Sequence, residues 1–213
     1  MSLLVKEIYP AIIGESSLSG RPALLIRLSE CNLRCTYCDT RYAWEGGRKR
    51  NREELVKISA RKGYQRILLT GGEPLLQEES IELMAELIRA GHKISLETNG
   101  SLPIAEVPEQ AQIIMDIKTP GSGQEGANLY QNLEFLKPED DLKFVLTGLS
   151  DYYWAKEIVR EFGLDKKFPV NFSPASGLLE PAKLARWLIR DKLNVRLNLQ
   201  IHKILFPGKE RGV

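Results

Sequence analysis

The stretch PALLIRLSECNLRCTYC, residues 22–38, is the part of the sequence that decides the fold. Its first seven residues are apolar apart from Arg27, as expected of a strand buried within a sheet. The rest holds all three cysteines of the chain within eight residues. A buried strand that leads directly into a reactive loop is typical of α/β proteins, in which loops at the carboxyl ends of the strands carry the functional site.

Strand-like and helix-like segments alternate beyond this stretch. The expected strands are 22–28, 66–70, 93–98, 112–118, 142–148, 169–173 and 195–200, and the expected helices are 52–63, 75–93, 151–163 and 180–191. About six such alternations predict parallel strands joined by crossover helices, which is an α/β architecture. Since there is no internal repeat and no linker, we expect residues 1–213 to form a single domain.

Polar residues follow these strands where the strands end. They are Thr70, Gly71, Gly72 and Glu73 after the second strand, Thr98 and Asn99 after the third, Lys118 after the fourth and Ser173 after the sixth. The carboxyl ends of parallel strands meet at one edge of the sheet. Residues far apart in the sequence are therefore expected to surround one ligand there.

Composition argues against several classes of partner. The chain has 30 basic and 28 acidic residues, a net charge of +2, which gives no basis for nucleic-acid or membrane-surface binding. No apolar run approaches the ~18 residues of a membrane span. The start, MSLLVKEIYP, lacks the pattern of a signal peptide. We therefore expect a cytoplasmic protein with no nucleic-acid or membrane partner.

The three cysteines, Cys31, Cys35 and Cys38, have the spacing C-x3-C-x2-C. Three thiolates in one short loop can bind one metal centre, either zinc or an iron–sulfur cluster. A structural zinc site takes four protein ligands. A [4Fe–4S] cluster held by three thiolates leaves one iron open, which can chelate the amino and carboxylate groups of S-adenosylmethionine (SAM) and release an adenosyl radical.

Other interpretations of these residues remain. Zinc would need His202 or His92 as a fourth ligand, and both are remote in sequence. Three unliganded thiols would oxidise readily. Gly71-Gly72 allows the backbone to approach a ligand closely, with Glu73 beside its ammonium group, or forms an ordinary turn. Lys118 can neutralise the SAM carboxylate or lie on the surface, and the stretch from Ser173 to Ser176 can contact the nucleoside or form a turn.

The cysteine spacing after the first strand, with Tyr37 before the last cysteine, resembles the signature of the radical SAM superfamily. The segment 5–44 further resembles the 7-carboxy-7-deazaguanine synthase family. The matching residues are Glu7-Ile8-Tyr9, Gly14-Glu15-Ser16, Gly20, Pro22, Arg27, Cys31-Asn32-Leu33 and Cys38-Asp39-Thr40. GGEPLL (71–76), LETNG (96–100) and QIHKIL (200–205) fit the same family.

The resemblance implies a compact radical SAM core, a partial TIM-type barrel of about six parallel strands. It implies ring contraction of 6-carboxy-5,6,7,8-tetrahydropterin to 7-carboxy-7-deazaguanine with loss of ammonia, in queuosine and related deazapurine biosynthesis. The radical comes from cluster-bound SAM, so no side chain is assigned as a catalytic residue. The implied cofactors are a [4Fe–4S] cluster, SAM and Mg2+. The implied partners are the pterin substrate, an electron donor such as flavodoxin or ferredoxin, and a second copy in a homodimer.

The resemblance also assigns roles to individual residues. Cofactor binding is expected at Cys31, Cys35, Cys38, Tyr37, Asp39, Gly72, Glu73, Asp116, Lys118, Ser173 and Ser176. Substrate binding is expected at Ile12, Ile13, Gly14, Glu15, Arg27, Thr70 and Pro207, and Thr40 matches the magnesium ligand. Ile13 stands where the family has glutamine, and its side chain cannot form a hydrogen bond to the pterin.

Two rival functions remain. Activases that place a glycyl radical on a partner protein have the same cysteine spacing and a similar size. The Cys38-Asp39-Thr40 motif, together with Arg27, the Gly14-Glu15 pair and QIHK, argues against an activase. A binding module stabilised by zinc, without catalysis, is the alternative from a different class of protein.

Overall fold

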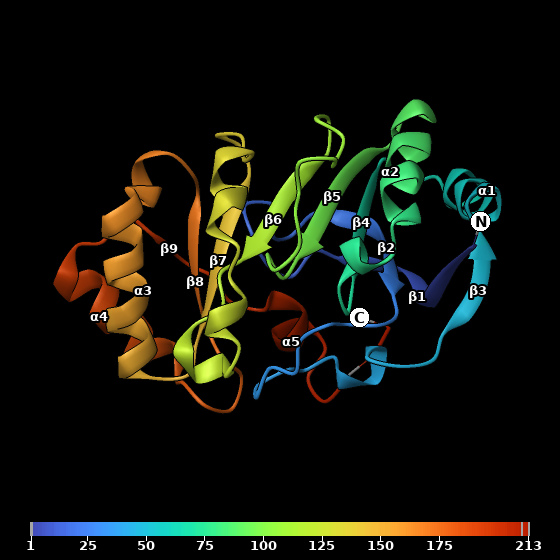
Figure 1. Cartoon of the computed structure of the whole chain (residues 1–213). Coiled ribbons are helices and arrows are strands. Elements are labelled where there is room, and N and C mark those ends of the chain that lie inside the picture. The colour runs from blue at the N-terminus through green and yellow to red at the C-terminus, as the bar shows by residue number, and fades with distance from the viewer. Residues whose placement is uncertain (1, 210, 213) are drawn as a thin grey trace.

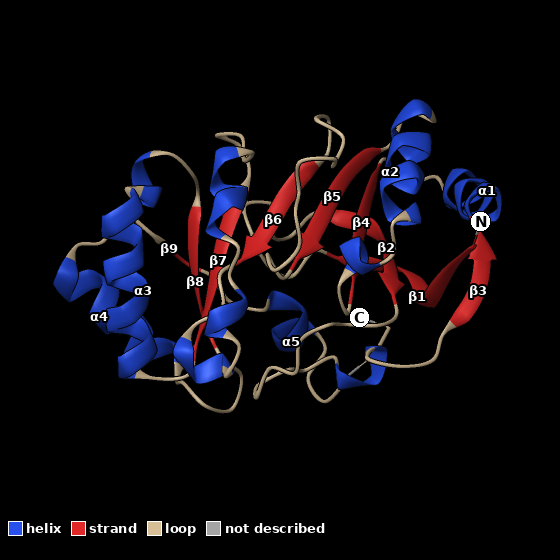
Figure 2. Ribbon diagram, viewed as in Figure 1, coloured by secondary structure: helices blue, strands red, loops and turns tan. Residues whose placement is uncertain are grey.

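The computed structural model describes residues 2–209 and 211–212, and one nine-stranded sheet runs through them (Figures 1 and 2). Its strands are β1 (Ser2–Ile12), β2 (Pro22–Leu28), β3 (Arg48–Asn51), β4 (Arg66–Gly71), β5 (Lys93–Thr98), β6 (Gln112–Asp116), β7 (Asp141–Leu146), β8 (Val170–Pro174) and β9 (Arg196–Leu197). Its α-helices are α1 (Arg52–Lys62), α2 (Glu79–Arg89), α3 (Leu149–Phe162), α4 (Pro181–Asp191) and α5 (Ile201–Leu205).

The strand order is β3-β1-β2-β4-β5-β6-β7-β8-β9. From β2 onward every neighbouring pair is parallel, which confirms the α/β prediction. β1 and β3 pair antiparallel at one edge, and the sequence pattern did not predict either strand. The four residues of β3 are polar, so they form a strand only because β1 offers free backbone groups for pairing.

The expected regular alternation of strand and helix is wrong at two connections. No α-helix links β5 to β6 or β6 to β7, where only turns and short 3-10 helices occur. The helix expected over 75–93 begins at Glu79, because Pro74–Leu76 form a separate 3-10 turn. The last strand is two residues long, since the polypeptide leaves the sheet after Leu197.

Side-chain chemistry explains the ends of α1. The helix begins after Asn51, whose side chain accepts a hydrogen bond from the backbone N–H of Glu54. It ends at Gly63, which has a left-handed conformation with φ 71°. The helix packs against α2, on the face of the sheet that carries the aliphatic core of β2, β4 and β5.

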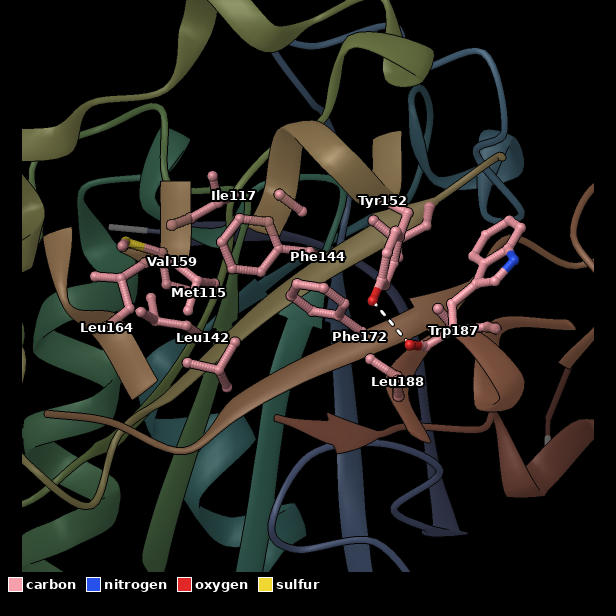
Figure 3. Close-up of a cluster of buried hydrophobic side chains, with 14 of the residues drawn as sticks. Met115, Ile117, Leu142, Phe144, Tyr152, Val159, Leu164, Phe172, Trp187 and Leu188 are labelled. Atoms are coloured by element: carbon pink, nitrogen blue, oxygen red, sulfur yellow. Dashed lines mark hydrogen bonds between the residues drawn. The ribbon is translucent and has the colours of Figure 1, made fainter. Parts of the chain in front are cut away.

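The second core is aromatic and lies between β6–β8 and the helices α3 and α4 (Figure 3). Phe144 and Phe172 meet edge to face with ring centroids 5.4 Å apart. The hydroxyl of the fully buried Tyr152 shares its one hydrogen between two acceptors, the Trp187 carbonyl at 3.1 Å and the Asp191 carboxylate at 2.9 Å. Tyr152 thereby joins α3 to α4. The sheet against which these helices pack holds the carboxyl ends of its strands in fixed positions.

The carboxyl ends of the parallel strands point to one side of the sheet, towards the cysteine loop and α5 (Figure 1). The loop follows β2 directly, and α5 returns to the same place from the end of β9. In the part of the chain that the structure describes, no helix has the length and apolar character that crossing a membrane requires.

Candidate active site

A cavity of about 490 Å³ opens at the carboxyl ends of the strands. Its walls come from the end of β1, the cysteine loop, the ends of β2 and β4–β8, and the segment from Gln200 to Lys203. The expected meeting of residues distant in sequence therefore occurs. Most of the predicted cofactor and substrate residues line this one space.

The cysteine loop is held by hydrogen bonds rather than by regular structure. The backbone N–H of Thr36 donates to the Ser122 carbonyl at 3.0 Å, and its hydroxyl donates to the Gly121 carbonyl at 2.7 Å. Cys31 Sγ accepts from the backbone N–H of Leu33 at 3.4 Å. These hydrogen bonds tie the loop to the turn at residues 121–122 and define its shape.

All three thiols are free, partly exposed and in the cavity wall. Burial raises the pKa of Cys35 and Cys38, and the ammonium of Lys118 opposes the shift at both. Among the residues placed by the structure, no three His, Cys, Asp or Glu side chains gather around one point suited to a single ion. A [4Fe–4S] cluster needs no such point, because each thiolate binds a different iron. The donor set, three soft thiolates beside a lysine, fits this cluster.

The Gly71-Gly72 turn packs directly against the cysteine loop. The backbone of the turn lies close to that of the cysteine loop, since the Glu73 N–H donates a hydrogen bond to the Glu30 carbonyl at 2.8 Å. A Cβ at Gly72 would collide with that carbonyl oxygen, and one at Gly71 would collide with the backbone of Leu28. Both glycines are therefore required for the close approach of the two loops.

The Glu73 side chain is fully buried and does not line the cavity. Its carboxylate accepts hydrogen bonds from the backbone N–H of Leu75 at 3.0 Å, the Thr98 hydroxyl at 2.9 Å and the Asn99 N–H at 2.6 Å. Burial raises the pKa of this carboxyl, against these hydrogen bonds. Glu73 thereby joins the ends of β4 and β5, and its contact with a ligand ammonium stays a prediction.

A chain of alternating charges crosses the cavity floor. Lys143 Nζ lies 2.6 Å from Glu15 and 3.2 Å from Asp116, and Lys118 Nζ lies 2.7 Å from Asp116. Burial lowers the pKa of both lysines, but the carboxylates outweigh it, so both values rise above the ordinary lysine value. Burial raises the pKa of Asp116, and the lysines more than reverse this. Lys118, Lys143 and Asp116 therefore stay charged at neutral pH.

Arg27 also faces the cavity, and Glu7 fixes it in place. The Arg27 Nε lies 2.6 Å from Glu7, and the Tyr42 hydroxyl donates to the same carboxylate oxygen at 2.7 Å. The Arg27 side chain is only 14% exposed. Buried guanidinium groups of this kind present a fork that matches a carboxylate ligand.

Glu97 is a site residue that we did not predict. It lines the cavity and accepts a hydrogen bond from the Thr70 hydroxyl at 2.7 Å. Burial raises its pKa, while Lys143 and Thr70 oppose the rise. The sequence carried a signal, because Glu97 belongs to the LETNG stretch at the end of β5. Lys143 and His202 were likewise missed, although His202 lies in QIHKIL.

The helix α5 contacts both the cysteine loop and the Gly14 segment. Asp39 accepts from Lys203 Nζ at 2.7 Å and from Gln200 at 3.2 Å. Burial raises the pKa of Asp39, but Lys203 outweighs this and brings it well below its usual range. The Ile201 N–H donates to the Gly14 carbonyl at 3.1 Å, and His202 leaves no room for a Cβ at Gly14.

The remaining predicted residues divide into those in the cavity wall and those outside it. Those in the wall are Ile12, Gly14, Glu15, Thr70, Tyr37, Asp39, Thr40, Ser173 and Ser176. Ile13 and Pro207 lie outside the wall. The Ile13 side chain is 1% exposed within a core cluster, its backbone N–H donates to the Arg21 carbonyl, and its carbonyl accepts from the Gly20 N–H. Pro207 is exposed, and the substrate contacts expected of both residues stay predictions.

Tyr37 and Thr40 bring side-chain hydroxyl groups to the wall near the cysteines. The Tyr37 hydroxyl is buried without a hydrogen-bond partner in the described part of the chain, and burial raises its pKa to about 12. The Thr40 hydroxyl donates to Asp39 at 3.0 Å. An unsatisfied buried hydroxyl beside the cysteines is the kind of group that a bound ligand completes.

Comparison with known proteins agrees with this geometry. The model of the radical SAM superfamily matches residues 25–130. The 7-carboxy-7-deazaguanine synthase of Koribacter versatilis is 41% identical, covering 98% of this chain and 99% of that protein. The enzyme of the same name from Chlorobaculum tepidum is 38% identical, covering 99% and 97%.

Solved structures share the fold. The crystal structure of QueE from Escherichia coli has a TM-score of 0.78 at 24% identity and covers 94% of each chain. That of Streptococcus suis SuiB has a TM-score of 0.58 at 17% identity, over 80% of this chain and 47% of the other. The predicted partial barrel of radical SAM type is confirmed. By its relatives along nearly its whole length, the chain belongs to the 7-carboxy-7-deazaguanine synthase family of radical SAM enzymes.

Proposed function

We propose that the protein converts 6-carboxy-5,6,7,8-tetrahydropterin to 7-carboxy-7-deazaguanine with loss of ammonia, as a lyase of queuosine and deazapurine biosynthesis. The observation that carries the proposal is the shared cavity. Three free cysteines lie in one wall, and Arg27, Glu15 and Glu97 lie in the others. Cofactor residues and groups suited to a small polar substrate therefore surround the same space.

On the cofactor side, Cys31, Cys35 and Cys38 would hold the [4Fe–4S] cluster and leave one iron for SAM. When bound, the cluster and SAM supply the radical that abstracts hydrogen from C6 of the pterin. The Gly72 backbone and the Lys118 ammonium lie on the cavity wall beside the cysteines, where they would orient the methionine part of SAM. Asp116 holds Lys118 in position. Tyr37, Asp39, Ser173 and Ser176 complete this side.

On the substrate side, Arg27 would pair with the pterin carboxylate through its terminal nitrogens while Glu7 holds Nε. Glu15, fixed by Lys143, would accept hydrogen bonds from the amino-pterin edge. Glu97 lies on the same wall, and burial raises its pKa, so it keeps its proton to a higher pH than an exposed glutamate does. Ile12, Gly14 and Thr70 would border the ring.

Thr40 would provide an oxygen ligand to Mg2+. Hydroxyl, water and substrate oxygens suit this hard ion. The Thr40 hydroxyl lies in the cavity wall beside the Asp39 carboxylate. We further propose that the protein works in the cytoplasm as a homodimer, that residues 1–213 act as a single radical SAM domain, and that a flavodoxin or ferredoxin supplies the electron.

The test is anaerobic incubation with SAM, dithionite and 6-carboxytetrahydropterin, with and without Mg2+, followed by mass spectrometry of the products. We expect 7-carboxy-7-deazaguanine and ammonia, with no product from Cys35→Ala. For Arg27→Ala we expect a KM for the pterin raised by at least about tenfold, since a charge-assisted bidentate pair is lost. SAM cleavage without deazaguanine, together with a glycyl radical on a partner protein, would instead identify an activase.

A further inference from the structure

Lys143 stands between the two sides of the cavity. Its Nζ lies 2.6 Å from Glu15 Oε2 and 3.2 Å from Asp116 Oδ1. Glu15 lies on the side that the proposed function gives to the pterin, and Asp116 pairs with Lys118 on the side that it gives to SAM. The Lys143 side chain is 11% exposed, so solvent and salt screen these ion pairs little. Lys143 therefore links a charged group of one side to a charged group of the other.

The two ion pairs of Lys143 are unequal. Its ammonium donates a hydrogen bond to Glu15 at 2.6 Å. The contact with Asp116 is longer, and Asp116 Oδ1 is buried without a hydrogen-bond partner in the described part of the chain. The other oxygen of this carboxylate, Oδ2, accepts from Lys118 Nζ at 2.7 Å. Asp116 thus keeps one acceptor oxygen that a small shift of the Lys143 ammonium would satisfy.

The backbone that carries Glu15 is held in place, whereas the lysine ammonium has freedom to move. The N–H groups of the two residues after Glu15 donate to buried side chains, at 3.1 Å to Asn198 and at 3.0 Å to Asp141. The Lys143 ammonium ends a stem of four carbons with rotatable bonds. A change at Glu15 is therefore passed on by the lysine side chain rather than by movement of the loop.

We propose that Lys143 is a positioning residue that couples the two sides of the cavity, so that pterin bound at Glu15 strengthens the binding of SAM. The inference rests on the proposed function, which gives Glu15 to the pterin and Lys118 to SAM. Hydrogen bonds from the amino-pterin edge compete with Lys143 for the Glu15 carboxylate. The Lys143 ammonium then moves towards Asp116 Oδ1, and the partly neutralised Asp116 attracts Lys118 less strongly.

The consequence falls on Lys118, whose ammonium becomes available to the SAM carboxylate. Coupling between two binding sites is reciprocal, so SAM strengthens pterin binding by the same factor. The charge chain thereby favours the state in which both molecules are present. An enzyme that generates a reactive radical benefits from this, since SAM is held best when the substrate is there to receive the radical.

The experiment measures SAM binding to the cluster-loaded, unreduced enzyme, so that no turnover takes place. Equilibrium dialysis gives the dissociation constant of SAM without and with saturating 6-carboxypterin, an oxidised analogue that has no hydrogen at C6. The ratio of the first constant to the second is the coupling factor. It is compared among wild type, Lys143→Met, which keeps the side-chain length and removes the charge, and Lys143→Arg, which keeps the charge.

Lys156→Met is the matched control. Lys156 Nζ lies 2.6 Å from Asp191 and its side chain is 13% exposed, but it joins α3 to α4 and does not line the cavity. Loss of a mostly buried ion pair should therefore affect the stability of both methionine variants. Loss of coupling should affect only Lys143→Met.

We expect a coupling factor of at least about fivefold in wild type and in Lys156→Met. In Lys143→Met the factor should fall to within about twofold of one, because no cation then joins the two carboxylates. Lys143→Arg should retain most of the coupling, since its guanidinium still lies between them. If Lys143→Met fails to retain iron, Lys143→Gln takes its place with the same expected loss.

A wild-type coupling factor in Lys143→Met would overturn the proposal. SAM binding weakened equally with and without 6-carboxypterin would also overturn it, since a merely structural lysine has that effect. A wild-type enzyme that forms 7-carboxy-7-deazaguanine but shows no coupling refutes only the role of Lys143. A wild-type enzyme that binds no 6-carboxypterin and forms no deazaguanine refutes the proposed function, and the inference with it.

Discussion

At the scale of single residues, the site is defined by which polar groups remain free to meet a ligand. Glu73 and Glu97 both carry carboxylates at strand ends. The Glu73 carboxylate accepts three hydrogen bonds within the protein, whereas Glu97 faces the cavity. Sequence patterns place both at the rim. They do not show which of the two side chains faces the cavity, because that depends on contacts with the neighbouring strand. This is why the sequence could not distinguish the two carboxylates, and why Glu97 was missed.

The variant Glu97→Gln tests the environment of this carboxyl. Burial raises its pKa above the ordinary 4.5, so the folded state takes up its proton more readily than the unfolded state. That contribution to stability is complete below the ordinary value and is lost as pH rises through the folded pKa. Lowering the pH from about 7 to about 5 should therefore stabilise wild type relative to the variant. Anaerobic urea unfolding measures this, and parallel curves at all pH values would contradict it.

Gly72→Ala tests the contact between the glycine turn and the cysteine loop. The new Cβ would collide with backbone of Glu30, which cannot rotate away as a side chain could. We expect a loss of about 1–3 kcal/mol in the free energy of unfolding and reduced iron content, because the loop must shift. Gly126→Ala is the matched control, since nothing lies near its Cβ. Normal iron binding by Gly72→Ala would show that the close approach is not required.

At the scale of elements, α5 closes one side of the cavity through three contacts with distant loops. Lys203 and Gln200 bond Asp39, and Ile201 bonds the Gly14 carbonyl. The sequence analysis could place QIHKIL in the site only by resemblance, because five residues carry little periodicity. β1 and β3 were missed for a related reason. Their strand character comes from pairing with each other and with β2, not from alternation of apolar residues.

Lys203→Ala should release α5 from the cysteine loop. Asp39 and Lys203 are 48% and 32% exposed, so stability should change by no more than about 1 kcal/mol. The KM for the pterin should rise several-fold while iron content stays constant, because α5 borders the cavity and holds no cysteine. The lowered pKa of Asp39 means that the ion pair persists at neutral pH and is lost as pH falls below the usual aspartate range. Lys167→Ala, on an exposed loop, is the control, and an equal KM change there would refute this role.

At the scale of the whole molecule, the parallel sheet is what brings the site together. The parallel pairing of the strands from β2 onward and the meeting of their carboxyl ends could be predicted from the apolar runs, and the structure confirms both. The chain of ion pairs from Glu15 through Lys143 to Asp116 could not be predicted from the sequence, because its three members come from different loops and strands. Such pairings depend on register, which periodicity alone does not fix.

The assembled sheet should remain when the cluster is removed, while the loops above it loosen. We expect chelation of iron to increase hydrogen exchange at residues 29–45 and 201–205, and to leave the central strands β4–β7 protected. The cause is that the cysteine loop and α5 hold each other through few contacts, whereas the strands have two buried cores. Mass spectrometry of exchanged amides measures this. Uniform loss of protection across the sheet would mean that the fold itself depends on the cluster.

The account depends most on three thiolates holding a cluster with one open iron. The direct measurement is electron paramagnetic resonance of the anaerobically purified, reduced protein before and after SAM is added, with iron and sulfide analysis of the same sample. We predict about four irons per chain and a cluster signal that changes when SAM binds. A single zinc in place of iron, or a cluster signal that SAM leaves unchanged, would contradict the account.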